Sequence, residues 1–314
     1  MEKFSFDGAM MHFVRTAAPG GFLWKFLLSY FAIYSLIFLA LWFLIGSVLI
    51  EFVSMGPREM ERMSESEAAR LFARMGIGYA MMIPLFLVAW SVIEAAIQRR
   101  YMRLAAFSVR LGADEFRLMA VALLWLLCFI GLYVVFALMM GVLIYIFAAG
   151  AGAGGGSPNP ALLVVTVLIM FGLFVPLILF LVRLSPAAAL TIRDRAVRFT
   201  SAWGVSKGRF WPMLGAFAII FIVSGIASSM VQNAGLLYFV GQFAASSGFE
   251  QADDPAVILS YMASPAVWGP GMLFVLVYLG LQAVVQYAAA GVPALAARTD
   301  PKWSAPDMPE RVFG

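Results

Sequence analysis

Side chains that could take part in chemistry are few in this 314-residue sequence, which has 12% charged residues and one histidine. Glu94 lies at the end of an apolar run, where an acid can hold a proton or a substrate or simply bond to polar neighbours. His12 could carry a proton near neutral pH, but the surface helix expected around it would leave it solvated. Asp253 and Asp254 would need a sheltered pocket for acid–base work, and Pro255 favours a helix start instead. We therefore expect no catalytic residues.

A metal site and a cofactor are not expected either. His12 and Cys128 cannot supply the ligands of a Cys/His zinc site, and neither a G-x-x-x-x-G-K-[ST] loop nor an H-E-x-x-H helix occurs. The other polar residues inside apolar segments lie on two helical faces. They are Ser224, Ser228 and Gln232 with the adjacent Asn233, and Gln282 with Gln286. These faces indicate either hydrogen bonds between two helices or a polar cavity between them.

The composition places these residues in a membrane protein. The sequence is 63% hydrophobic, whereas soluble proteins are about 45–50% apolar and about 25% charged. A soluble core of this size does not need so many apolar residues, so we expect lipid around most of the chain. The basic residues lie in short gaps between apolar runs, which favours a role in membrane topology over nucleic-acid binding.

Six apolar segments are long enough to cross a bilayer as helices, which takes about 20 residues each. They comprise residues 22–50, 75–96, 118–148, 161–182, 213–241 and 272–297. Ser64 and Glu67 form a capping box, which predicts that a helix leading into the second span begins there. Asp114 is expected to cap the third span, and Asp254 with Pro255 predicts a short helix before the sixth.

The lysine and arginine residues predict the orientation of these spans. Four of the 21 lie between the first and second spans, and all others lie in the gaps or span ends on the opposite side. The four are Arg58, Arg62, Arg70 and Arg74. The positive-inside rule therefore predicts a multi-pass membrane protein with both termini in the cytoplasm.

A short pattern recurs at intervals of 92 residues. It consists of Thr16, Gly20 and Lys25, then Ser108, Gly112 and Arg117, then Thr200, Gly204 and Arg209. We interpret it as three parallel repeats, each with a cytoplasmic amphipathic surface helix, ended by the glycine, and two spans. The units comprise residues 1–97, 98–189 and 190–297, and residues 298–314 form a cytoplasmic tail.

Basic residues of the surface helices are the best candidates for function. A helix from Ile192 to Trp203 would carry Ala196 and Phe199 on its apolar face and arginines beside it. Cations at a cytoplasmic interface attract anionic lipid by about 1 kcal/mol each. The candidate head-group-binding residues are Lys25, Arg99, Arg100, Arg103, Arg117, Arg193, Arg195, Arg198, Lys207 and Arg209.

Two stretches carry a family resemblance. They are RLGADEFRL, residues 110–118, and TSAWGVSKGRFWPMLG, residues 200–215. They resemble the membrane domain attached to glycerophosphoryl diester phosphodiesterases and the YciC-type inner-membrane proteins, in which a surface helix ending in S-W-x-x-x-[KR]-G-x-[FW] leads into a span. Here Ala202 is inserted between Ser201 and Trp203. The resemblance implies a bacterial inner membrane. It implies no phosphodiesterase activity, because the soluble catalytic barrel and its histidines are missing from this sequence.

The leading hypothesis is an all-α, non-enzymatic polytopic membrane protein that binds anionic phospholipid, or organises the membrane, through its basic helices. A membrane-protein partner or a second copy of the chain stays open as a further partner. The alternative is a transporter or channel for a small molecule or lipid, with a polar path between the fifth and sixth spans. An intramembrane enzyme acting on a lipid comes third, and it would need a buried carboxylate or serine within hydrogen-bond reach of a base.

Overall fold

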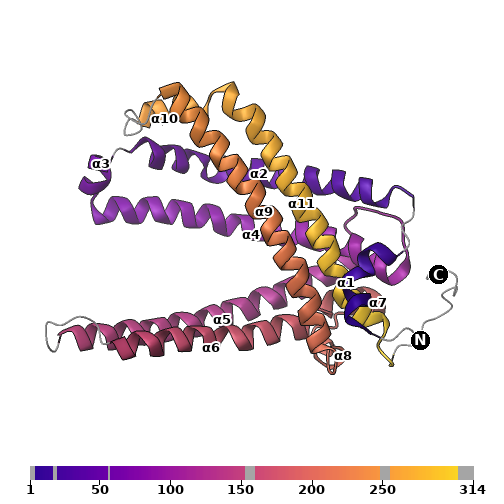
Figure 1. Ribbon diagram of the computed structural model, residues 1–314. Coiled ribbons are helices and arrows are strands. Elements are labelled where there is room, and N and C mark those ends of the chain that lie inside the picture. Colours follow the sequence, from indigo (N-terminus) through magenta and orange to yellow (C-terminus); the bar gives the residue numbers. More distant parts are fainter. Residues whose placement is uncertain (1–3, 17–19, 56, 153–159, 248–254, 303–314) are drawn as a thin grey trace.

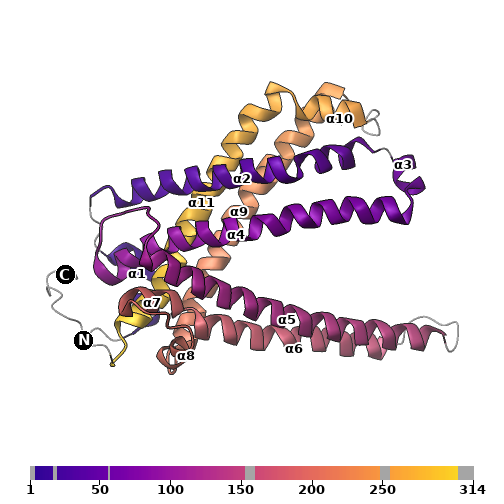
Figure 2. The same cartoon turned by 180° about the vertical axis from the view of Figure 1, so that it is seen from behind.

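Six long helices meet at one end of the molecule and diverge toward the other (Figure 1, Figure 2). The computed structural model describes residues 4–16, 20–55, 57–152, 160–247 and 255–302. Helices are the only regular elements in these ranges. In chain order they are α1 (Phe6–Arg15), α2 (Phe22–Ser54), α3 (Pro57–Arg62), α4 (Glu65–Arg103), α5 (Ala113–Gly152), α6 (Pro160–Leu184), α7 (Ala187–Asp194), α8 (Ser201–Val205), α9 (Phe210–Ser247), α10 (Pro255–Met262) and α11 (Pro265–Arg298).

Six segments of the structure are long and apolar enough to cross a membrane, as predicted. Five lie in α2, α4, α5, α9 and α11, and the fourth in chain order, Phe174–Asp194, comprises the second part of α6 together with α7. Their outer surfaces carry large exposed apolar side chains such as Phe43, Tyr145 and Leu237. Water would disfavour so much exposed apolar surface, and the hydrocarbon core of a bilayer accommodates it. By length and composition, these are the helices of a multi-pass membrane protein.

Helix starts follow the sequence signals in two places and differ in a third. The Ser64 hydroxyl accepts from the Glu67 N–H, and the Glu67 carboxylate accepts from the Ser64 N–H at 2.9 Å, which confirms the capping box of α4. The short helix α10 begins at Pro255 as predicted, although Asp254 lies outside the described residues. The third span begins at Ala113, so Asp114 lies in the first turn of α5, where its carboxylate binds arginines instead of capping the helix.

Buried residues concentrate where the helices meet. We call this end the junction: α1, α7 and α8, the last turns of α4 and α11, and the first turns of α2, α5 and α9 (Figure 1). Residues 91–102 of α4, 187–192 of α7 and 290–297 of α11 are all buried. Many of these residues are alanines, whose small side chains let helix backbones approach closely. We call the successive pairs of long helices, α2 with α4, α5 with α6 and α9 with α11, hairpins. The three hairpins are therefore held together chiefly at the junction.

The structure does not confirm three amphipathic surface helices. Helix α1 is present and packs against α9 and α11. In the second unit, α4 continues to Arg103 and residues 104–112 form no helix, so that prediction is wrong. In the third, α7 ends before Arg195, whose φ of 53° turns the chain, and α8 begins only at Ser201. Ile192 and Trp203 consequently do not share one helical face.

The recurring glycines do not end helices as expected. Gly112 directly precedes α5, and Gly204 lies inside α8. Among the described glycines, the left-handed conformation is adopted by Gly21 and Gly208, which precede α2 and α9. The proposed unit boundary after residue 97 falls inside α4 and that after residue 189 falls inside α7, and residues 303–314 of the tail lie outside the described residues. The threefold division stays a prediction.

Candidate functional site

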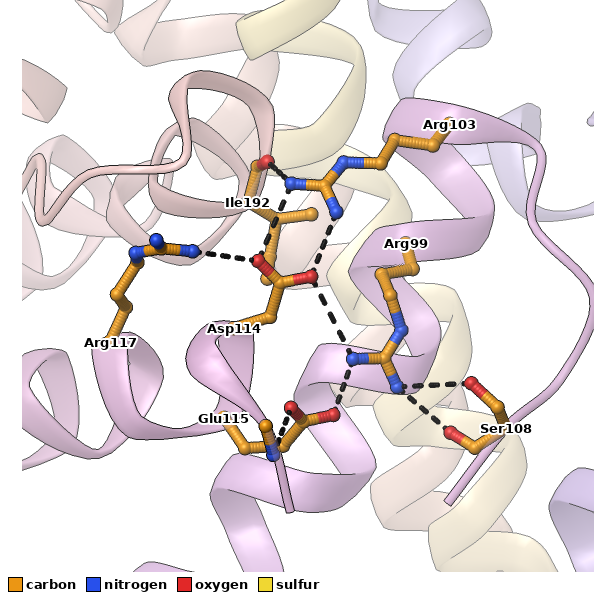
Figure 3. Close-up of polar contacts among 8 residues, drawn as sticks. Arg99, Arg103, Ser108, Asp114, Glu115, Arg117 and Ile192 are labelled. Atoms are coloured by element: carbon orange, nitrogen blue, oxygen red, sulfur yellow. Dashed lines mark hydrogen bonds and ion pairs between the residues drawn. The ribbon is translucent and has the colours of Figure 1, made fainter. Parts of the chain in front are cut away.

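Asp114 joins α4 to α5 at the centre of a buried ionic network (Figure 3). Its carboxylate lies 2.8 Å from Nη1 of Arg103 and 3.1 Å from Nη1 of Arg117. Arg103 also donates to the main-chain carbonyl of Ile192 in α7. One carboxylate thus positions two arginines that the sequence offered as head-group ligands, and it fixes three helices relative to one another.

Arg99 and Glu115 form the second half of this network. Arg99 donates from Nη1 to Glu115, and from Nη2 to the carbonyl of Ser108 at 2.8 Å (Figure 3). The other oxygen of Glu115 accepts from the N–H of Gly112 at 3.0 Å. Because both charges are buried, their pairing specifies how α4 and α5 meet, whereas removing one partner would leave an unpaired charge inside the protein.

Three arginines link the ends of α4, α7 and α11 in cyclic order. Arg103 of α4 donates to the carbonyl of Ile192 in α7, and Arg193 of α7 donates to the carbonyl of Ala297 in α11 at 2.7 Å. Arg298 closes the ring by donating to a carbonyl in the last turn of α4 at 3.2 Å. Carbonyls in a last helical turn lack intrahelical partners and attract cations, so these arginines act as caps between helices.

The remaining basic candidates either contact other protein groups or have exposed side chains. Arg209 donates to the carbonyls of Ala296 and Thr299 at 2.5 and 2.6 Å, a further cap on α11. Arg198 is half-exposed and lies 3.4 Å from Asp194. Three more cations, Lys25, Arg195 and Lys207, have exposed side chains at the junction.

The two polar faces of the fifth and sixth spans do not form one lining. Gln282 of α11 donates to Ser228 of α9 at 3.2 Å, which joins the two helices. Gln286 instead turns toward α4, with its Nε2 3.5 Å from the carboxylate of Glu94. The same carboxylate accepts from Gln98 at 2.8 Å. Ser224 bonds within its own helix, and Gln232 and Asn233 are exposed.

His12 is buried, contrary to the expectation of a solvated side chain. Its ring stacks on Tyr101, with centroids 5.3 Å apart. Burial, with the positive charges of Arg298 and Arg100, lowers the pKa of His12 from 6.5 to about 3. The imidazole is therefore neutral at physiological pH, because α1 packs onto the bundle with His12 facing inward.

Repeat-motif residues Thr16 and Ser108 offer carbonyls to arginines of α4, whereas Thr200 is exposed before α8. Ser206 lies nearby in the sequence Gly204-Val205-Ser206-Lys207-Gly208, which has the G-x-S-x-G spacing of hydrolase nucleophiles. Its buried hydroxyl donates toward the carbonyls of Arg183 and Trp203 at the end of a short helix. A nucleophile elbow instead follows a strand and is activated by a base, so Ser206 is a structural residue.

Cavities in the described part of the chain adjoin the junction, and two of them lie among four helices each. The larger, about 670 Å³, lies among α4, α5, α6 and α9 and is lined by apolar side chains such as Trp90, Trp125 and Phe217. The smaller, about 390 Å³, lies among α1, α2, α4 and α11 and has Arg100 in its wall. Sequence reasoning identified Arg100 as basic but gave no sign of this cavity, which is formed by four helices distant in sequence.

Sequence reasoning did not identify the groups that the arginines bind. Asp114 and Glu115 follow the basic gap directly, and this adjacency was the available signal for the ionic network. Main-chain carbonyls as ligands leave no mark in a sequence. Comparison of the chain with protein-family models, curated proteins and solved structures gives no match.

Proposed function

We propose that this is a non-enzymatic integral membrane protein whose junction faces the cytoplasm of a bacterial inner membrane and binds anionic phospholipid. The observation that carries the proposal is the presence of both exposed cations and exposed tryptophans at the junction. Trp24 and Trp211, 67% and 76% exposed, lie close in sequence to Lys25 and Lys207. Tryptophan and basic residues are the usual anchors at the lipid head-group level.

Contacts within the junction reduce the set of basic residues that we assign to head-group binding. Arg99, Arg100, Arg103, Arg117, Arg193 and Arg209 contact protein groups inside the junction. We assign head-group binding to the exposed residues Lys25, Arg195, Arg198 and Lys207. The large apolar cavity supports a lipid ligand further, since an acyl chain could fill it.

The proposal also includes three expectations from the sequence: kinship with the membrane domains named above, a threefold internal repeat, and the lack of a catalytic function. A transporter with a polar path between α9 and α11 is the alternative. The Gln282–Ser228 hydrogen bond favours helix-to-helix contact over such a path, because the two side chains satisfy each other.

A lipid-quenching experiment tests the proposal. The protein is reconstituted into phosphatidylcholine bilayers with increasing brominated phosphatidylglycerol, and quenching of its eight tryptophans is measured. We expect preferential quenching by the anionic lipid in the wild type and a loss of preference in a Lys25→Glu, Arg195→Glu, Lys207→Glu variant, since each cation contributes about 1 kcal/mol.

Charge reversal at Arg62 and Arg70, which are exposed and far from the junction in sequence, is the matched control and should leave the preference unchanged. An equal response of wild type and junction variant to the anionic lipid would refute head-group binding by these residues.

A further inference from the structure

Arg100 is a buried cation that lacks a carboxylate partner among the described residues. Arg100 is only 2% exposed. Nη2 donates to the carbonyl of Thr16 at 2.6 Å, whereas Nε and Nη1 are buried and have no hydrogen-bond partner in the described part of the chain. Neighbouring Arg99, by contrast, is bound to Glu115. Arg100 therefore has two buried donor atoms that no group in the described residues satisfies.

Such a cation is costly to keep inside a protein without an anion. The rings of Phe22 and Tyr287 lie 4.7 and 5.0 Å from the guanidinium carbon and offset part of this cost. The ring faces do not accept the in-plane N–H groups of Nε and Nη1, and the carbonyl of Thr16 accepts only from Nη2. The electrostatics call for an oxyanion, whose oxygens can accept charge-assisted hydrogen bonds from these N–H groups.

The cavity beside Arg100 has the form that an amphiphile requires. Its volume is about 390 Å³, and apart from Arg100 and Thr16 its wall consists of mostly apolar side chains of α1, α2 and α11. Val14, Leu23 and Val284, at 61%, 49% and 50% exposed, belong to that wall and make its outer part apolar. A soluble anion would gain nothing from this apolar wall, whereas a hydrocarbon chain would lose contact with water along it.

We propose that this cavity binds the acidic head group of a lipid, whose phosphate oxygens accept hydrogen bonds from Arg100 while its chain lies against Leu23, Leu27 and Val284. The inference rests on the proposed function in one respect, namely that the ligand is an anionic lipid. The site itself is interior and separate from the exposed cations Lys25, Arg195 and Lys207.

Thermal unfolding of the delipidated protein in a neutral detergent tests this site. The probes are oleoyl-lysophosphatidylglycerol, oleoyl-lysophosphatidylcholine and inorganic phosphate. We compare the wild type with Arg100→Met, which removes the anion ligand, and with Val284→Trp, which fills the cavity and retains Arg100. Arg110→Gln, an exposed cation between α4 and α5 that belongs to neither proposed site, is the control for nonspecific charge.

We expect a saturable rise in Tm with lysophosphatidylglycerol alone, and an apparent affinity reduced about tenfold or more in Arg100→Met and Val284→Trp but not in Arg110→Gln. If Arg100→Met fails to fold, Val284→Trp decides. Wild-type affinity in Val284→Trp, or equal shifts with lysophosphatidylcholine, would overturn the site. An equal Arg100-dependent shift with inorganic phosphate would overturn the lipid as ligand.

The triple charge-reversal variant separates the two proposals. Retained lysophosphatidylglycerol affinity in that variant, together with lost lipid preference in bilayers, supports both the interior site and the exposed one. Loss of the interior affinity alone in Val284→Trp, with bilayer preference unchanged, supports the interior site as a distinct element.

Discussion

Arg193 donates a hydrogen bond of 2.7 Å to the carbonyl of Ala297, although 104 residues separate them. The contact joins α7, the short helix between the second and third hairpins, to the last turn of α11. With Arg103 and Arg298 it forms a ring in which each helix end is capped by an arginine of another. The junction is therefore closed by interactions of arginine with main-chain carbonyls, and not only by apolar packing.

Replacing Arg193 should destabilise the junction, because the carbonyl of Ala297 and the carboxylate of Asp300 would lose their partner. We expect Arg193→Met to reduce the unfolding free energy by about 3 kcal/mol, as for a broken buried pair. The exposed neighbour Arg195, changed to Met, is the control and should shift stability by about 0.5 kcal/mol at most. Thermal unfolding in detergent measures both. Equal effects would show that the cap does not stabilise the fold.

Arg99 and Glu115 should behave as one unit. Glu115→Gln leaves the buried Arg99 guanidinium with only the 3.9 Å contact to Asp114, which Arg103 and Arg117 share, so we expect a loss of about 3 kcal/mol. The double variant Arg99→Met, Glu115→Gln removes both charges and should recover most of that loss. A double-mutant cycle by chemical unfolding measures the coupling. Additive effects of the two single substitutions would contradict the pairing.

His12 should make stability depend on pH. Its pKa is about 3 in the folded protein and 6.5 when exposed, so the unfolded chain binds the proton more readily between these values. Its contribution is present above pH 6.5 and decreases as pH falls toward 3, by about 2 kcal/mol at pH 5 relative to pH 8. We expect His12→Phe to flatten the pH dependence of Tm. A variant with the wild-type slope would assign that slope to other groups.

The Gln282–Ser228 hydrogen bond should contribute modestly to the packing of α11 on α9. Ser228→Ala is expected to reduce stability by about 0.6–1 kcal/mol, the range for hydrogen bonds between membrane helices. Ser224→Ala is the matched control, since that hydroxyl bonds to the carbonyl of Phe221 in its own helix. Unfolding in mixed micelles measures the difference. A larger loss for Ser224→Ala would indicate that the face has another role.

The candidate site was predictable in residue type and not in arrangement. The basic gap after the second span identified Arg99, Arg100 and Arg103, and the adjacent acids were visible in the sequence. The pattern suggested a surface helix there, but α4 extends only to Arg103 and residues 104–112 form no helix. Arg99 and Arg103 of α4 pair with Glu115 and Asp114 of α5. The last turns of α4 also bring Arg100 into the interior, where no short-range pattern could place it.

Sequence alone determined the six spans and the capping box at Ser64, because the length of an apolar run and local cap chemistry depend on neighbouring residues only. Tertiary structure decided which arginines are buried, that His12 faces Tyr101, and that Arg100 borders a cavity. Those outcomes depend on contacts between helices far apart in the chain. For a cation at the end of a membrane helix, such contacts decide whether it meets lipid or the protein interior.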